Sequence, residues 1–301
     1  MEIKIATFNV ENLFARYRFR DNFDPASSTG FGINNQAFSL YDDDSKKITG
    51  KVIREVHPDI LCLQEVENLE VLERFNTTYL GGLGYKYRMV IDSHDPRHID
   101  VAVLSTFPIK SVMTYRHDRN NANTAWLFSR DCLEVAFDCN GHELIVYNNH
   151  FKSMIRTRAE TRDRRREQVD RVADIITDKW GPNYDKNIVV LGDFNDYTGA
   201  ETALTNLVSH EGLVDVIHES TIPANEKYTH YWAGGNQYSQ IDFILLGKEL
   251  YELNKETDPE IFRNGLPYRA DRYNGPRIVD VGDNRPKASD HCLVSMKMRL
   301  L

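Results

Sequence analysis

One apolar run constrains this chain more than any other: residues 189–196 read Val-Val-Leu-Gly-Asp-Phe-Asn-Asp. An apolar run without polar alternation is typical of a strand that is buried on both faces. Gly192 would allow a tight exit from that strand. Because side chains two residues apart on an extended segment point the same way, Asp193 and Asn195 would face one spot. Such a pair suits a hydrated cation or a phosphate oxygen, and it suits a simple Asx-turn equally well.

Several further segments read as strands, and helical patterns separate some of them. The expected strands cover residues 3–10, 59–66, 85–91, 98–105, 132–138, 143–150, 240–246 and 289–296. Asn140-Gly141 predicts a two-residue hairpin turn between two of these strands. Apolar spacing predicts a helix over residues 48–56, and a short helix is expected over 200–207. Residues 16–46 and 251–287 read as long surface loops.

The longest expected helix begins at Thr157, where Thr157-Arg158-Ala159-Glu160 forms a capping box. Its apolar stripe comprises Val169, Val172, Ala173, Ile176 and Trp180. A basic run from Arg156 to Arg166 lies in the first turns, although cations at a helix N-terminus oppose the helix dipole. This run is either a solvated face or a group that meets phosphates.

Composition and the absence of a linker indicate one α/β domain spanning residues 1–301, and the hydrophobic fraction of 41% suffices for a sizeable core. The net charge of −8 argues against broad electrostatic wrapping of nucleic acid. It does not argue against a phosphate substrate, because a bound metal inverts the local field.

Cysteine usage points to a reduced compartment. The four cysteines show no metal-type spacing, and Cys62 and Cys292 lie in apolar runs, so a cytoplasmic protein is expected. Export by a signal peptide absent from this chain stays open. No apolar run approaches the roughly 20 residues of a membrane span.

Polar residues gather at the predicted strand boundaries. These residues are Asn9, Glu65, Asp100, His150, Asp193, Asn195, Asp242, Asp290 and His291. If the strands form packed sheets, their side chains can cluster at one rim. So many carboxylates cannot share a site without a cation, and oxygen ligands favour Mg²⁺ or Mn²⁺. A zinc site has little support, because cysteine ligands and a His-x-x-x-His helix are both missing.

Two histidines in such a cluster suggest acid–base chemistry. Each has a plausible carboxylate to orient its ring: Asp242 for His291, and Asp100 for His150. One histidine would activate water while the other protonates the leaving oxygen. This arrangement predicts hydrolysis of a phosphoester by direct in-line attack.

Six motifs in order then resemble the endonuclease/exonuclease/phosphatase superfamily, which includes deoxyribonucleases, repair nucleases, sphingomyelinases and inositol polyphosphate 5-phosphatases. The motifs are Thr7-Phe8-Asn9-Val10, Gln64-Glu65-Val66, Asn149-His150-Phe151-Lys152-Ser153, Gly192-Asp193-Phe194-Asn195, Ile241-Asp242-Phe243-Ile244 and Ser289-Asp290-His291. The resemblance covers nearly the whole chain. It implies a four-layered α/β sandwich, in which two packed mixed β-sheets are flanked by helices.

The resemblance also implies roles for the metal ligands and the base. Glu65 would be the principal ligand of Mg²⁺ or Mn²⁺, with Asn9 and Asp290 nearby. His291 would be the general base, oriented by Asp242.

The remaining residues would act on the nucleophile and the phosphate. The resemblance implies that Asp193 and Asn195 position the nucleophile and the scissile phosphate. It implies that His150 contacts phosphate or acts as general acid, as in the deoxyribonuclease-like branch. That branch has a glutamate where Asp100 stands, and the local match is loose. Lys152 matches a His-x-Lys-Ser variant of bacterial members, from which a phosphate contact is inferred.

The family pattern determines the reaction better than the substrate. The His150 motif, the basic run and the aromatic residues of two loops, over 16–46 and over 230–236 (the aromatic loop), favour a nuclease or nucleic-acid phosphodiesterase. The acidic net charge favours the alternative, a small-molecule or lipid-headgroup phosphoester. A third hypothesis, a catalytically silent binding protein on the same fold, conflicts with the complete set of catalytic residues.

Overall fold

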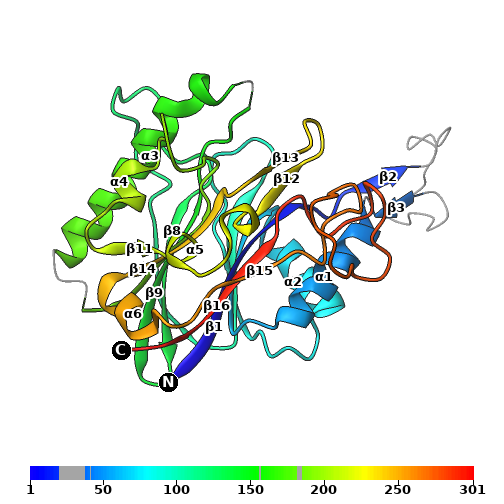
Figure 1. Cartoon of the computed structure of the whole chain (residues 1–301), viewed down its shortest axis with the longest axis horizontal. Helices are drawn as coiled ribbons and strands as arrows, with labels where there is room; N and C mark the ends of the chain where they lie inside the picture. Colours follow the sequence, from blue (N-terminus) through cyan, green and yellow to red (C-terminus); the bar gives the residue numbers. More distant parts are fainter. Residues whose placement is uncertain (20–37, 41, 156, 182–184) are drawn as a thin grey trace, which may run out of the picture.

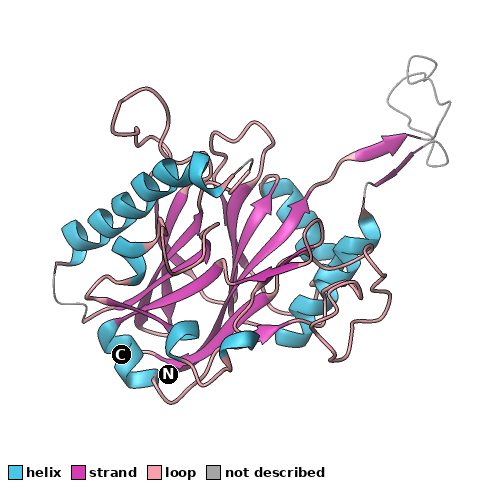
Figure 2. Ribbon diagram, turned by 45° about the horizontal axis from the view of Figure 1, so that its top comes forward, coloured by secondary structure: helices cyan, strands magenta, loops and turns pink. Residues whose placement is uncertain are grey.

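The computed structural model describes residues 1–19, 38–40, 42–155, 157–181 and 185–301. Two six-stranded mixed sheets face one another, and helices cover their outer sides (Figures 1 and 2). This is the expected four-layered α/β sandwich. None of the helices in these ranges is long and apolar enough to cross a lipid bilayer.

The first sheet has the order β15-β16-β1-β4-β6-β5. Its strands are β1 (Glu2–Leu13), β4 (Ile60–Val66), β5 (Tyr87–Val90), β6 (Asp100–Ser105), β15 (Glu260–Phe262) and β16 (Leu293–Arg299). Strands β1 and β4 run parallel, and the other neighbours are antiparallel. Helices α1 (Asp43–Val56) and α2 (Leu69–Tyr79) pack on its outer face, where apolar side chains such as Val52 and Phe75 join Ala6 and Leu61.

The second sheet has the order β11-β14-β10-β9-β8-β7. Its strands are β7 (Ile109–Thr114), β8 (Cys132–Cys139), β9 (His142–His150), β10 (Asn187–Asp193), β11 (Leu213–Asp215) and β14 (Asp242–Gly247). Strands β9 and β10 run parallel. Helix α3 (Arg158–Trp180) covers the outer face together with α4 (Thr205–Val208), as Figure 1 shows. Within the described residues, the remaining helices are α5 (Val216–Glu219), α6 (Lys248–Asn254) and a 3-10 helix at Ala224–Glu226.

The position of strand β10 explains why the chain is apolar where residues 189–191 cross the sheet. Val189 and Leu191 face the core between the two sheets, whereas Ile188 and Val190 pack under α3. Both faces of the strand are therefore buried, as the sequence predicts. The Asn140-Gly141 hairpin is also confirmed, and both residues have positive φ, as a two-residue hairpin turn requires.

Some boundaries differ from the expectation. Helix α1 begins at Asp43 rather than at residue 48, because its polar first turn carries no apolar periodicity. The helix expected over 200–207 is reduced to α4, and the loop expected over 251–287 contains the end of α6 and strand β15.

Two hairpins lie outside the main sheets. Most of the loop over 16–46 lies outside the described residues, but strands β2 (Tyr17–Phe19) and β3 (Phe38–Leu40) pair within it. Strands β12 (His230–Trp232) and β13 (Gln237–Ser239) form the second hairpin, in the aromatic loop.

Candidate active site

Strand register brings three predicted site residues side by side. Asp193 ends β10 and pairs with His150 of β9 on one side and with Asp242 of β14 on the other. Gly192 makes this close approach possible: its φ is +130°, and a Cβ there would lie 1.9 Å from the carbonyl oxygen of Asn149. No other residue fits this position.

Asp193 lies at the centre of the site and accepts three hydrogen bonds. Its Oδ1 accepts from the Asn195 backbone N–H at 2.9 Å, and its Oδ2 accepts from the side-chain amides of Asn195 and Asn9, each at 3.0 Å. Asp193 therefore forms the Asx-turn with the Asn195 N–H and also shares a polar site with the Asn195 side chain. The second amide proton of Asn195 is donated to the Phe151 carbonyl at 3.1 Å, so both of its donors are used within the protein.

His291 and Asp242 form the expected couple. Nδ1 of His291 lies 2.9 Å from Oδ2 of Asp242, and the Thr229 hydroxyl donates to the same oxygen at 2.7 Å. Burial alone would lower the pKa of His291, but the carboxylates of Asp242 and Asp193 outweigh it and raise the pKa well above its ordinary value. Nε2 of His291 is 3.9 Å from Asp193 Oδ2, so it faces the centre of the site.

His150 is buried on the opposite side of Asp193. Its Nε2 lies 3.4 Å from Asp193 Oδ2 and 3.9 Å from Glu65 Oε1. Its Nδ1 makes no hydrogen bond within the described ranges. The expected pairing of His150 with Asp100 is therefore wrong. Asp100 begins β6 in the other sheet, where its Oδ1 accepts from the Ser93 backbone N–H at 3.0 Å.

A buried arginine that sequence reasoning missed lies beside His150. Arg130 is 1% exposed, pairs with Asp95 at 3.2 Å and donates to the carbonyl of Phe151, the residue after His150. Burial, reinforced by the positive charge of Arg130, lowers the pKa of His150 well below its ordinary value. No periodicity marks a single arginine before a strand, so the sequence carries no signal for it.

Carboxylates form the opposite wall of the site. Glu65 has φ +66° at a bulge of β4, and burial together with the nearby Asp290 raises its pKa. Glu11, which sequence reasoning also missed, accepts from the Asp290 backbone N–H at 3.0 Å and pairs with Lys287 at 2.8 Å. Carboxylates buried this close together, such as Glu65 and Asp290, favour a bound cation.

The donor set next to these carboxylates consists of hard oxygens. Glu65 and Asp290 contribute carboxylate oxygens, and Asn9 contributes an amide oxygen that already accepts from the Glu11 N–H at 3.1 Å and has a second lone pair. This set fits Mg²⁺ or Mn²⁺.

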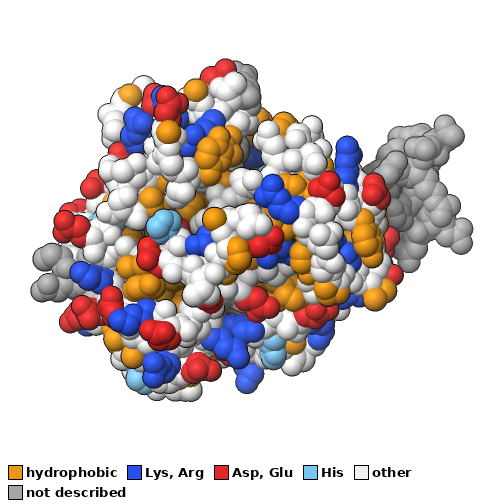
Figure 3. All heavy atoms as spheres, viewed as in Figure 1, with side chains coloured by type: hydrophobic (Ala, Val, Ile, Leu, Met, Phe, Trp, Pro, Cys, Tyr) orange, Lys and Arg blue, Asp and Glu red, His pale blue; other side chains and the backbone are white. Residues whose placement is uncertain are grey.

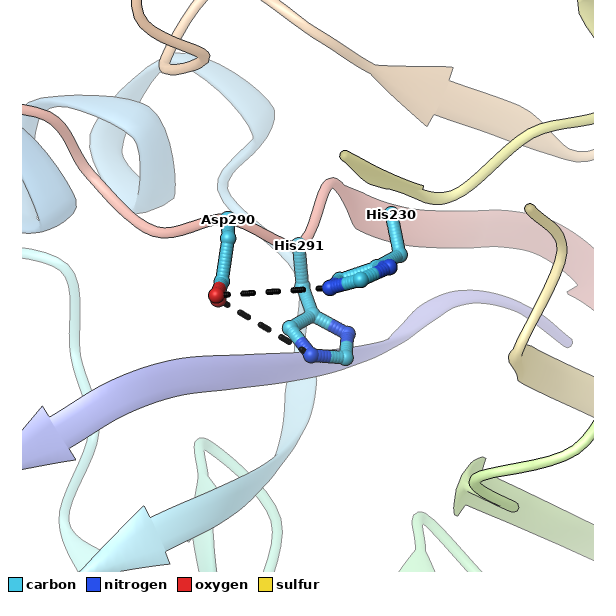
Figure 4. A group of neighbouring side chains, drawn as sticks. All are labelled: His230, Asp290 and His291. Atoms are coloured by element: carbon cyan, nitrogen blue, oxygen red, sulfur yellow. Dashed lines mark ion pairs between the residues drawn. The ribbon is translucent and has the colours of Figure 1, made fainter. Parts of the chain in front are cut away.

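Two groups of three side chains also lie close enough to hold a metal ion: Asp193, Asp242 and His291, and separately His230, Asp290 and His291. The first group is already joined by the hydrogen bond between His291 and Asp242. The second contains His230 of β12, whose site position the sequence did not predict (Figure 4).

The predicted phosphate ligand Lys152 lies in the segment between the end of β9 and the start of α3. Its backbone is held on both sides: its N–H donates to Gln168 at 2.8 Å, and its carbonyl accepts from Arg165 at 3.1 Å. Its ammonium group has no hydrogen bond or ion pair to any described residue. Burial lowers the pKa of this ammonium, and the nearby Arg130 lowers it further.

Several arginines of the basic run pair within the protein, whereas Arg166 is exposed and Arg156 lies outside the described residues. Arg158 and the fully buried Arg165 both pair with Asp196, at 2.5 Å and 3.2 Å. Arg162 pairs with Glu201 at 3.1 Å. These arginines therefore tie α3 to the turn that follows Asp193.

Known proteins place this geometry in context. The family model described as "Endonuclease/Exonuclease/phosphatase family" matches residues 4–261. No curated protein matches the chain.

Solved structures share the fold at low identity. Truncated TDP2 of Caenorhabditis elegans is 16% identical with a TM-score of 0.63, covering 99% of this chain and 97% of that one. The human Nocturnin catalytic domain, solved with a bound sulfate anion, is 15% identical with a TM-score of 0.64, covering 100% and 95%. D. rerio TDP2 complexed with a single-strand DNA product is 15% identical with a TM-score of 0.62, covering 99% of each chain. The family match spans most of the sequence, and the chain belongs to the endonuclease/exonuclease/phosphatase family of phosphoester hydrolases.

Proposed function

We propose that this protein hydrolyses phosphodiester bonds in nucleic acid, with water activated by His291. The observation that carries the chemistry is the His291–Asp242 couple, whose free Nε2 faces Asp193 across 3.9 Å. Asp242 holds the proton on Nδ1. The carboxylates that raise the pKa of His291 also favour a proton on Nε2, and a divalent cation bound at the neighbouring carboxylates would offset their negative charge, leaving the Nε2 lone pair to take a proton from water. Thr229 in turn fixes the orientation of Asp242.

The neighbouring residues divide into positioning groups and phosphate contacts. Asn195 and Asn9 hold Asp193, and Asp193 orients the nucleophile. His150 is favoured as a neutral donor to a phosphate oxygen rather than as a general acid, because its buried imidazole lies near Arg130. The ammonium of Lys152, which pairs with no described residue, is suited to a second phosphate oxygen.

A divalent cation completes the proposed chemistry. Glu65, Asp290 and Asn9 would hold Mg²⁺ or Mn²⁺, which supplies positive charge next to the phosphate oxygens. The protein residues then need only bind the phosphate, orient water and move a proton at His291 Nε2.

Exposed aromatics next to site residues support a nucleic-acid substrate. Trp232, which is 53% exposed, follows His230 by two residues, and Tyr197, which is 41% exposed, follows Asn195 by two. The guanidinium of Arg158 lies 4.0 Å above the Tyr197 ring. Aromatic faces of this kind stack on bases and are tolerant of sequence. The D. rerio TDP2 structure with its DNA product is consistent with this substrate class on this fold.

Surface charge favours a second candidate, a small-molecule phosphoester. The chain carries a net charge of −8, and basic and acidic side chains are interspersed on the face shown in Figure 3. Three arginines of α3, Arg158, Arg162 and Arg165, pair with Asp196 or Glu201 rather than remaining available to a nucleic-acid backbone. A small substrate needs no extended basic surface.

The test is cleavage of supercoiled plasmid and of single-stranded oligonucleotides with Mg²⁺ or Mn²⁺, alongside an EDTA control. His291→Ala should lower turnover by about 10²- to 10⁴-fold with the fold unchanged. Trp232→Ala should raise KM for oligonucleotides, while Tyr87→Ala, at an aromatic that is 36% exposed on β5, should not. Hydrolysis of a generic phosphodiester without any cleavage of nucleic acid would move the assignment to the small-molecule candidate.

A further inference from the structure

Two imidazole rings face one carboxylate at the mouth of the site (Figure 4). His230 Nε2 lies 4.0 Å from Asp290 Oδ2, and His291 Nε2 lies 3.9 Å from Asp290 Oδ1. Both separations are too long for hydrogen bonds. One donor atom from each residue can be chosen so that all three lie within 4.8 Å of one another. Two nitrogens and a carboxylate oxygen thus face a common point.

Backbone pairing holds the two histidines together. His230 and His291 form an antiparallel bridge, and their ring centroids are 4.7 Å apart. The Tyr231 N–H donates to the Asp290 carbonyl at 2.8 Å, and the Cys292 N–H donates to the Thr229 carbonyl at 2.6 Å. The three side chains are therefore positioned by the chain itself, before any ion binds.

The second ring nitrogen of each histidine is engaged elsewhere. His291 Nδ1 is bound to Asp242 at 2.9 Å, and His230 Nδ1 lies 3.4 Å from the Ser239 hydroxyl. This leaves both Nε2 atoms toward Asp290. Metal-binding histidines commonly show this pattern, in which the other nitrogen is held by an oxygen. The Asp290 side chain is 30% exposed, so an ion can enter from solvent.

We propose that His230, Asp290 and His291 form a zinc-binding site that inhibits this enzyme. Two imidazoles and one carboxylate are a donor set that zinc uses readily, with water in the fourth position. Zinc ligands lie about 2.0–2.1 Å from the ion, so tetrahedral ligands are roughly 3.4 Å apart, and binding must bring the three donor atoms, which lie within 4.8 Å of one another, closer together.

Inhibition follows because the zinc ion would bind His291 Nε2. Zinc at this site takes the lone pair of His291 Nε2, the same lone pair that activates water. It also competes with the hard cation for Asp290. This consequence rests on the proposed role of His291, whereas the binding itself does not.

Binding is tested first, on the metal-free full chain, by competition for Zn²⁺ with a chromogenic chelator in excess Mg²⁺. Wild type should bind one Zn²⁺. His230→Phe and His230→Gln should each bind at least tenfold more weakly. His218→Phe alters a histidine whose side chain is 72% exposed, and this variant should match wild type. Far-UV circular dichroism checks the fold of each variant. Wild-type affinity in both folded His230 variants overturns the site.

The ligand atoms and the inhibition are tested separately. In ¹⁵N spectra of histidine-labelled protein, Zn²⁺ should shift the Nε2 resonances of His230 and His291 together. Zn²⁺ should also stop hydrolysis of a generic phosphodiester by wild type at concentrations at least tenfold below those needed for His230→Gln. Tight zinc binding with undiminished turnover overturns the inhibitory role. Failure to cleave nucleic acid in the absence of zinc bears on the proposed substrate alone.

Discussion

The side-chain amide of Asn9 donates a hydrogen bond to Oδ2 of Asp193 at 3.0 Å, and this bond joins the two sheets at the site. Asn9 lies on β1 of one sheet and Asp193 ends β10 of the other. Both side chains are buried. The bond therefore couples the carboxylate wall to the catalytic couple, and it predicts that sheet packing and turnover depend on the same contact.

Asn9→Ala should lower both stability and turnover. It removes a donor to a buried carboxylate, which costs about 1.5–3 kcal/mol for a charged partner, and it frees Asp193 to move. Urea unfolding and kcat measure the two effects. Asn187→Ala is the matched control, because Asn187 is also buried and bonded but lies at the other end of β10. It should lower stability without a comparable loss of kcat; equal losses of kcat in both variants would contradict a local role for Asn9.

Gly192→Ala should destabilise the protein far more than Gly199→Ala. Both glycines have positive φ, at +130° and +109°, so each alanine costs backbone strain of about 1–2 kcal/mol. A Cβ at Gly199 meets nothing within 4 Å, whereas at Gly192 it collides with the Asn149 carbonyl. Strands β9 and β10 must then separate, which displaces His150 and Asp193. Thermal unfolding and kcat should both show the difference, and similar behaviour of the two variants would rule out this close approach.

Asp196→Ala should be strongly destabilising, because it leaves the buried guanidinium of Arg165 without its carboxylate. Breaking a buried ion pair from one side costs about 3–5 kcal/mol. Glu201→Gln breaks an exposed ion pair with Arg162 of α3, since the Glu201 side chain is 77% exposed. This change should cost no more than about 1 kcal/mol. Urea unfolding of both variants gives the comparison. A small loss for Asp196→Ala would show that the α3 arginines are not structural.

Asp100→Asn should become more stabilising as pH rises. Burial raises the pKa of Asp100 from 3.8 to about 7. Between these values the folded protein keeps a proton that the unfolded chain releases, so this group makes wild type less stable as pH increases through that window. Asparagine has no such proton, and the variant should gain about 1.4 kcal/mol per pH unit relative to wild type between roughly pH 4 and 7.

Unfolding free energies at pH 5 and pH 8 measure this gain. Asp163→Asn, at a carboxylate that is 86% exposed, controls for the general change in net charge. An Asp100→Asn difference that is the same at both pH values would refute the burial argument.

Most of the fold could be predicted because its signals are local. Apolar runs identified the central strands, Asn140-Gly141 identified the hairpin, and the capping box placed the start of α3, where the Thr157 hydroxyl accepts from the Glu160 N–H at 3.2 Å. Boundaries failed where polar residues continue an element, as in the first turn of α1.

Site residues could be predicted from the sequence only where they lie at the end of a strand. His291 and Asp242 meet as expected, because both lie at strand ends of the same rim. Asp100 also lies at a strand end, but it accepts a hydrogen bond from Ser93 in the loop between β5 and β6, and Arg130 lies beside His150 instead.

The sequence by itself determined the family, the central strands and the polar residues at their ends, because turn chemistry and periodicity act over a few residues. It did not predict helix α2 or strands such as β7 and β11. Only the tertiary structure decided that His230 faces Asp290, that Glu11 joins the carboxylate wall, and that Arg158 and Arg165 pair with Asp196. These contacts join residues tens to hundreds of positions apart. They depend on strand register and on how two sheets pack, which no local pattern encodes.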